Sequence, residues 1–437
     1  MIVEIWTAAQ VKALRVSALR ETQEQFARRI GWQPRTVRKW ERAGDDRPMR
    51  ADRAAALDEA LKRLNPEQLQ RFTAALTLDH TASVVHSGEA ATRTSTTEED
   101  DVRRRELGKL AAVAAAALPV WEHGFQPRIG TEDVRRLTVL VDELLATDQR
   151  IGGGTLVDTA TDMLHRTMVL LETCTFDEQT GRHFLSAAGN LAVAAGWLAY
   201  DADRQELARR CYADALSLGS AADDEDLVVH ACLSTALQAT AMARRGRGSP
   251  SYVLTMVGRA KSLVRGRPPG RVHALIAARE AGAYGLMDDR SGFDRAMSTA
   301  WREMEAAEHF EPITECPTWL RFVTPAEIRG HEARGLSEIG HQRRAIELFE
   351  LACGEHAGPR NTVNIRAWTA AARVRAGDVT GALHEGLEVL THLEQSVTSP
   401  RTMRTLEPVV AATRDTSAGE GFRARYRALT TTETTAP

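Results

Sequence analysis

The 437-residue sequence has few cysteines, few aromatic residues and no long hydrophobic run. The five cysteines are odd in number, lie far apart and form no CxxC pair, which argues against a disulfide framework or a zinc site. They are Cys174, Cys211, Cys232, Cys316 and Cys353. The longest apolar stretch, residues 110–120, is too short to cross a bilayer of about 30 Å. We therefore expect a cytoplasmic protein that does not enter a membrane.

Aromatic residues make up only 5% of the chain, and runs of β-branched residues are scarce. Ala, Leu, Arg and Glu dominate almost every window, and these residues favour helices over strands. A hydrophobic content of 43% is sufficient for packed cores, and the length suggests two to four domains. The composition therefore predicts an all-α protein with more than one domain.

The net charge of −3 hides an uneven distribution of charge along the chain. Residues 1–78 contain fifteen Lys and Arg against ten Asp and Glu, a local charge of +5, which leaves −8 for the remainder. The chain as a whole is therefore neither a polycation for nucleic acid nor an acidic solvating tail. The opposite signs indicate that the two parts of the chain have different roles.

The first 78 residues are expected to form five helices. Amphipathic spacing predicts a helix over residues 7–20, and a short helix over 23–30 ends at Gly31, where a positive φ is often required. Pro34 is suited to the first position of the third helix. The fourth and fifth helices are predicted over residues 51–64 and 66–78.

A Ser- and Thr-rich segment over residues 79–101 contains almost no large apolar residue and ends in four acidic residues, which predicts a flexible linker. Residues 102–429 are predicted to form one helix after another, and the apolar run 110–120 is expected to be the first packed helix. The Thr-rich end, residues 430–437, is expected to be unstructured.

Small and aromatic residues recur at spacings of four and three within this long helical region. The triples are Ala208, Tyr212 and Ala215; Ala345, Phe349 and Ala352; and, more weakly, Val253, Val257 and Ala260, then Ala296 with Ala300, then Ala382 with Val389. Their intervals exceed the roughly 34 residues of an ideal tetratricopeptide repeat. The pattern therefore predicts a degenerate, tetratricopeptide-like α-solenoid of stacked helical hairpins.

One segment of the N-terminal part has the residue spacing of a helix-turn-helix. A small residue is needed where the two helices cross, a glycine makes the turn between them, and two apolar residues anchor the second helix to the core. The residues that carry the pattern are Gln23, Ala27, Gly31, Val37 and the pair Trp40-Glu41. This segment closely resembles the helix-turn-helix of the lambda-repressor/Cro type.

With Val37 and Trp40 facing inward, the opposite face of the second helix carries arginines that can enter a DNA major groove. Arg35 and Arg38 are the predicted base contacts, because a guanidinium bonds guanine O6 and N7 in a bidentate way. The full set of predicted DNA-binding residues is Gln23, Gln33, Arg35, Thr36, Arg38, Lys39 and Arg42.

The remaining members of this set have less specific expected roles. Gln33 is expected either to form hydrogen bonds with adenine or to contact the DNA backbone. The resemblance implies that Gln23 contacts a phosphate, and Lys39 and Arg42 are expected to do the same as point charges. Trp32 departs from the family pattern, which has a smaller apolar residue there. Its side chain either packs on the domain or meets a sugar-phosphate edge, and the sequence leaves both open.

A Cro-type head followed by a tetratricopeptide-like body resembles a group of actinobacterial transcriptional regulators. The high Ala and Arg content, the Arg-Arg-Arg-Glu-Leu start at residues 103–107 and the segment Ala195–Asp201 are similar to that group. The layout is also similar to that of the peptide-pheromone-sensing regulators of Gram-positive bacteria. The resemblance implies a cytoplasmic homodimer that binds double-stranded DNA and senses a ligand, with a short peptide expected first and a small apolar metabolite second.

Two other classes of function remain open at this point. A protein-protein scaffold with a helix-turn-helix that no longer binds DNA would share the same layout. An enzyme is disfavoured, because no nucleophile arrangement, HExxH metal motif or phosphate loop is present, and no cofactor or metal is expected. The triplet Gly152-Gly153-Gly154 lacks the P-loop lysine and is predicted to be a flexible turn.

Overall fold

The computed structural model describes residues 6, 8–41, 51–64, 68, 72, 128–355, 359–395 and 398–434. The chain divides into two compact units, residues 1–93 and 94–437. Every element named within the described residues is helical, and the β-contact found there is an isolated bridge between Arg128 and Thr175. The expected all-α class is confirmed for this part of the chain.

The first unit is a small helical domain with its own core. Its helices are α1 (Ala8–Lys12), the π-helix η1 (Ala13–Leu19), α2 (Gln23–Ile30), α3 (Pro34–Glu41) and α4 (Ala51–Lys62). The first predicted helix thus changes from α to the wider π form at Ala13, and it ends at Arg20, whose φ is 55°. Phe26 and Leu14 are fully buried in the core, together with Val37 and Leu57.

Several predicted features lie outside the described residues. They are Arg42, most of the helix predicted over 66–78, the linker predicted over 79–101 and the first packed helix expected at 110–120.

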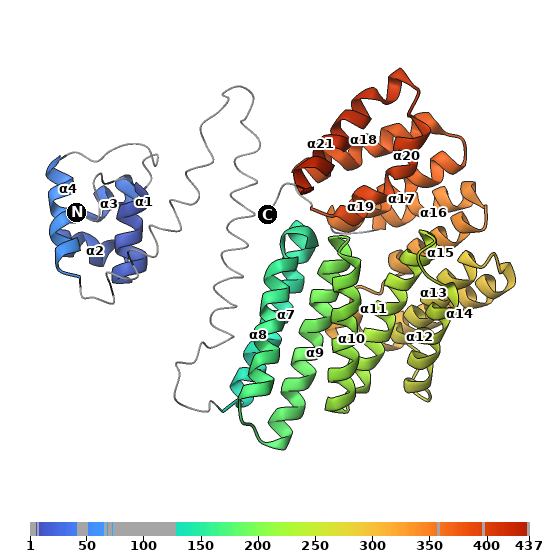
Figure 1. Ribbon diagram of the computed structural model, residues 1–437, viewed down its shortest axis with the longest axis horizontal. Helices are drawn as coiled ribbons and strands as arrows, with labels where there is room; N and C mark the ends of the chain where they lie inside the picture. Colours follow the sequence, from blue (N-terminus) through green and yellow to red (C-terminus); the bar gives the residue numbers. More distant parts are fainter. Residues whose placement is uncertain are drawn as a thin grey trace. The chain divides into compact units, whose positions relative to one another are not determined.

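The second unit is a succession of helices that pack mainly against their neighbours in sequence (Figure 1). They are α7 (Thr131–Ile151), α8 (Val157–Thr173), α9 (Glu178–Asp201), α10 (Gln205–Ala222), α11 (Glu225–Arg244), α12 (Pro250–Leu263), α13 (Arg271–Leu286), α14 (Arg290–Phe310), α15 (Pro325–Glu338), α16 (Gln342–Glu355), α17 (Pro359–Arg375), α18 (Val379–Gln395), α19 (Pro400–Thr405), α20 (Glu407–Ala412) and α21 (Glu420–Thr434). Short 3₁₀ segments are η2 (Gly153–Thr155), η3 (Thr318–Leu320) and η4 (Ser417–Gly419).

The periodic small and aromatic residues identify the helix faces that pack. Tyr212 on α10 and Phe349 on α16 are 1% and 0% exposed, and the alanines on either side of each are fully buried. The corresponding residues of α12, α14 and α18 are buried as well. The helices pair as α9 with α10, α11 with α12, α13 with α14, α15 with α16 and α17 with α18. The prediction that these positions pack between consecutive helices is therefore confirmed.

The last helices of this unit return to its first ones. The amide of Thr398 donates to the carbonyl of Ile151 at 3.0 Å, and the amide of Gly154 donates to the carbonyl of Thr398 at 3.1 Å. Gly152 has a φ of 81°, and a Cβ at this position would lie 2.4 Å from the Thr398 carbonyl oxygen. The glycine triplet therefore allows two backbones about 245 positions apart in sequence to touch.

Helix α21 continues through Thr434, into the segment 430–437 that was expected to be unstructured. The side-chain hydroxyls of Thr430 and Thr431 donate to the Arg427 carbonyl at 3.0 and 2.6 Å. Phe422, together with the partly buried Tyr426 and Leu429, holds this helix on the core. In the part of the chain that is described, none of the helices has the length and apolar character needed to cross a membrane.

Candidate nucleic-acid interface

Helix α2 has well-defined ends. The Thr22 hydroxyl accepts a hydrogen bond from the Gln25 amide at 3.2 Å, and the Gln25 side chain accepts one from the Thr22 amide at 2.8 Å. These reciprocal bonds form a capping box. At the other end Gly31 adopts a φ of 74°, and its amide donates to the Ala27 carbonyl. The predicted turn at Gly31 is confirmed, and it fixes where α3 begins.

Helix α3 is anchored by its inner face. Val37 is 0% exposed and Trp40 is 2% exposed, as the sequence spacing predicted. Ala27 on α2 is fully buried, which is consistent with a small residue where the two helices meet. The ring of Trp32 contacts the ring of Trp40 edge-on, with centroids 5.1 Å apart. Trp32 thus packs on its own domain, the first of the two alternatives left open by the sequence, and its side chain is half-buried.

The outer face of α3 carries the predicted DNA-binding side chains. Gln33, Arg35, Arg38 and Lys39 are exposed, and Thr36 is half-buried. Among the described residues, Arg35 has no hydrogen-bond or ion-pair partner. Four of these residues lie on α3, and Gln33 directly precedes it.

Arg38 is held by residues of α2 instead of extending freely. Its Nε donates to Gln23 Oε1 at 3.1 Å, and its Nη2 lies 2.6 Å from Glu24 Oε1. The backbone amide of Glu24 at the start of α2 and the Arg38 guanidinium together lower the pKa of Glu24 below its usual value. Arg38 therefore has an acidic partner in this structure that DNA would have to replace.

A second carboxylate, Glu41, links three helices beneath this surface. Arg15 of η1 donates to both Glu41 oxygens, at 2.6 and 2.9 Å, and Gln23 Nε2 donates to Glu41 Oε2 at 2.6 Å. The Glu41 side chain is only 7% exposed and that of Arg15 is 13% exposed. Glu41 fixes the amide of Gln23 so that its Oε1 faces Arg38. Glu41 of the motif thus has a physical role that spacing alone did not assign.

These residues surround an open depression of about 470 Å³ at the N-terminal end of α2. Lys12, Arg15 and Arg38 bring three positive charges to it, and Glu41 brings one negative charge. Gln23 lies between them. Sequence reasoning predicted Gln23 and Arg38 here but missed Lys12, Arg15 and the contacts of Glu41. The amphipathic pattern of residues 7–20, which leaves basic residues on the outer face, was the available signal for the first two.

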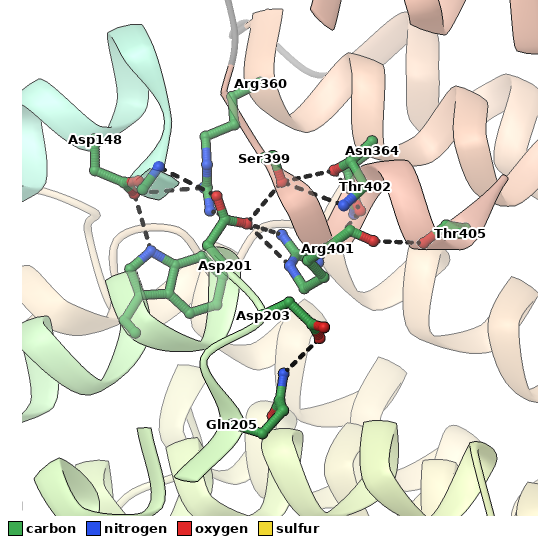
Figure 2. Close-up of polar contacts among 12 residues, drawn as sticks. Asp148, Asp201, Asp203, Gln205, Arg360, Asn364, Ser399, Arg401, Thr402 and Thr405 are labelled. Atoms are coloured by element: carbon green, nitrogen blue, oxygen red, sulfur yellow. Dashed lines mark hydrogen bonds and ion pairs between the residues drawn. The ribbon is translucent and has the colours of Figure 1, made fainter. Parts of the chain in front are cut away.

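The second unit contains a buried cluster of opposite charges where its last helices meet its first ones (Figure 2). Asp201 of α9 accepts hydrogen bonds from Arg401 Nε and the Ser399 hydroxyl, both at 3.0 Å. Arg360 of α17 lies 3.2 Å from Asp201 and 3.5 Å from Asp148. Both aspartates are 0% exposed. The cluster joins α7 and α9 to α17 and α19.

The pKa values of the two aspartates of this cluster shift in opposite directions. Burial raises the pKa of Asp148, and the charge of Arg360 offsets this only in part. Burial acts in the same direction on Asp201, but Arg360 and Arg401 outweigh it and lower the pKa of Asp201 below its usual value. The Gly153 amide also donates to Asp201 at 3.2 Å. The cluster therefore has a structural role, which is to hold these helices together.

The described residues form neither a disulfide nor a metal-binding cluster. All five cysteines are free thiols. No group of three or more His, Cys, Asp or Glu side chains with metal-binding geometry occurs within the described ranges. The chain matches no protein-family model, and no curated protein sequence matches it.

Proposed function

We propose that the protein is a sequence-specific, DNA-binding transcriptional regulator of the cytoplasm. Its first unit acts as a lambda-repressor/Cro-type head, and its second acts as a tetratricopeptide-like body that dimerises and senses a ligand. The proposed role is binding and regulation, not catalysis.

The observation that carries this proposal is the outer face of α3. Val37 and Trp40 are buried and fix the helix, whereas Arg35 on its opposite side is exposed and without a partner among the described residues. A helix about 10 to 12 Å across enters a major groove that is about 12 Å wide. A guanidinium at its N-terminal end can then bond guanine O6 and N7, which contributes roughly 1 to 3 kcal/mol of discrimination.

The depression beside α3 supports a phosphate contact. Three cationic side chains and the one carboxylate of Glu41 line it, and Gln23 is the first residue of α2. The N-terminal end of a helix carries a partial positive charge that favours a phosphate. Lys39 on α3 is exposed and adds a further cation to this surface. Such contacts position the helix in the groove, and the base contacts of Arg35 and Arg38 would specify sequence.

The experiment that tests the proposal is selection of duplex DNA from a random pool by the purified full chain. We expect enrichment of one motif, with two related half-sites about one helical turn apart. Binding to the enriched duplex should weaken with salt at a log-log slope near −0.9 per phosphate contact. A pool that stays random after repeated selection would refute sequence-specific binding.

Dimerisation is proposed because a single head contacts few bases. Two heads about 34 Å apart would engage two half-sites and reach useful affinity. Sedimentation equilibrium of the full chain at micromolar concentration should give a mass of twice 48.0 kDa. A monomer both free and on DNA would contradict this part of the proposal.

The proposed ligand of the body is a short peptide, with a small apolar metabolite as the second possibility. The support is the stack of helical pairs from α9 to α18, since stacked pairs form extended surfaces that offer repeated contacts to a chain. A ligand can shift DNA binding only by its different affinity for two shapes of the body, typically about 1 to 3 kcal/mol.

A second candidate function is a protein-protein scaffold with a head that no longer binds DNA. The contact of Arg38 with Glu24 favours it, because this side chain already has a partner within its own domain. Replacing both Arg35 and Arg38 by Ala distinguishes the two functions. Loss of the selected-DNA complex supports the regulator, and an unchanged complex supports the scaffold.

A further inference from the structure

A small pocket lies between α11, α13 and α15 in the second unit. Its volume is about 30 Å³, and guanidinium groups from all three helices line it. The lining includes Arg244, Arg279, Arg334, His331, Thr240 and Gly282. A space of roughly 10 to 15 Å³ holds one water molecule, so this pocket accommodates a group of only a few atoms.

The three arginines differ in how their charges are balanced. Arg244 Nε lies 2.7 Å from Glu338, and Arg334 Nη2 lies 3.8 Å from Glu327. Arg279 is 5% exposed and forms no ion pair with a carboxylate in the described part of the chain. Its Nη1 contacts His331 Nε2 at 2.5 Å, and its buried Nε has no hydrogen-bond partner. A buried guanidinium with an unused donor is costly unless another acceptor is present.

His331 does not supply the missing negative charge. Burial and the charges of Arg334 and Arg279 lower the pKa of His331 to about 3, so its ring is neutral at physiological pH. Its Nε2 lies between Arg279 Nη1 and Glu327 Oε1, at 2.5 and 3.2 Å. Burial, and repulsion by Arg279 and Arg244, lower the pKa of Arg334 to about 10. Three guanidinium groups therefore share two carboxylates at this site.

The pocket also has room because one of its walls is a glycine. A Cβ on Gly282 would approach only Thr240 Cγ2 at 3.6 Å, which is ordinary van der Waals contact. The space in front of Gly282 is therefore filled by no side chain of the described residues. A guanidinium presents donors in a planar fork that matches a carboxylate.

We propose that this pocket binds one carboxylate group of an acidic small molecule or peptide, with Arg279 as its main partner. The planar shape of a carboxylate and the small volume favour it over a tetrahedral phosphate. This inference rests on the proposed ligand-sensing function for the identity of the molecule that carries the carboxylate. The binding itself is independent of DNA.

The test is thermal unfolding of the full chain in sodium acetate, compared with sodium chloride and sodium phosphate at the same ionic strength. Binding to the folded state raises the melting temperature with anion concentration. We expect acetate at about 100 mM to raise it by roughly 2 °C or more above chloride, and phosphate to match chloride.

Two variants remove the site in different ways. Arg279→Met removes an unpaired buried charge, so it should raise the melting temperature without acetate and abolish the acetate response. Gly282→Val keeps the charge but fills the pocket, and it should abolish the response as well. Arg259→Met, at an exposed position of α12, is the matched control and should respond as the wild type does.

An acetate response that persists in both pocket variants would overturn the proposal, as would no acetate response in the wild type. Stabilisation by phosphate but not acetate would overturn the choice of a carboxylate. A chain that responds to acetate but selects no DNA would leave the pocket intact and refute the proposed regulator, so the two failures are distinguishable.

Discussion

Arg38 has two competing sets of partners, one within the protein and one proposed on DNA. In the structure its guanidinium contacts Gln23 and Glu24, and its side chain is 51% exposed. Exposed ion pairs of this kind contribute little to stability, because water screens both charges. The contact with Glu24 is therefore weak enough for DNA to displace it, as the proposed function requires.

This competition predicts the effect of Glu24→Gln. The change removes the acidic partner of Arg38 and one negative charge from the proposed DNA-binding surface. Affinity for duplex DNA should increase by roughly threefold, because a charge at the rim of an interface mainly changes electrostatic attraction. Fluorescence anisotropy at two salt concentrations measures this. Glu59→Gln on α4 is the matched control, and an equal gain in both variants would show that only net charge matters.

At the scale of an element, the turn between α2 and α3 depends on the positive φ of Gly31, so replacing this glycine should lower stability. Gly31→Ala meets no atom within 4 Å, so its cost comes from the φ of 74° alone. The first unit should lose about 1 kcal/mol of unfolding free energy. Differential scanning calorimetry of the full chain measures the change. Gly258→Ala, also with open space but inside helix α12, should stabilise the second unit by about 0.5 to 1 kcal/mol. A loss of similar size in both variants would contradict the backbone argument.

How far the sequence predicted the structure depends on the range of the interactions involved. Gly31, Val37, Trp40 and the Tyr212 triple were correctly placed because helix period and turn geometry are local properties. Arg15 and Glu41 were missed as partners, since their contact depends on how η1 crosses α3. The contact of residues 152–154 with Thr398 could not be inferred, because nothing local links segments so distant in the chain.

At the scale of the second unit, the buried cluster around Asp201 joins the last helices to the first. Asp201→Asn leaves Arg360 and Arg401 without their shared carboxylate. Breaking a buried pair in this way costs about 3 to 5 kcal/mol. Urea unfolding should show this loss, and proteolysis should cut first between α18 and α19. Asp158→Asn, in an ion pair whose aspartate is 79% exposed, should change stability by less than about 1 kcal/mol. Equal effects of the two substitutions would refute the role of the cluster.

The lowered pKa of Asp201 also predicts how the stability of the fold depends on pH. The pKa of Asp201 is lower in the folded protein than its ordinary value of 3.8. Its ionised form therefore stabilises the fold, and this contribution is fully present above pH 3.8 and is lost as the pH falls through the folded pKa. Asp201→Asn should unfold less steeply with acid below that pH than the wild type. Parallel acid-unfolding curves, followed by circular dichroism, would contradict the assignment.

The central claim, that the outer face of α3 reads DNA bases, is tested most directly by a ratio of affinities. The measurement is the dissociation constant of wild type, Arg35→Ala and Arg63→Ala for the selected duplex and for a scrambled duplex of equal length. We predict that Arg35→Ala weakens binding to the selected duplex about 10-fold more than to the scrambled one. Arg63→Ala, which removes the same charge from the residue after α4, should leave the ratio unchanged. If Arg35→Ala weakens both duplexes equally, the arginine contributes charge alone and α3 does not read sequence.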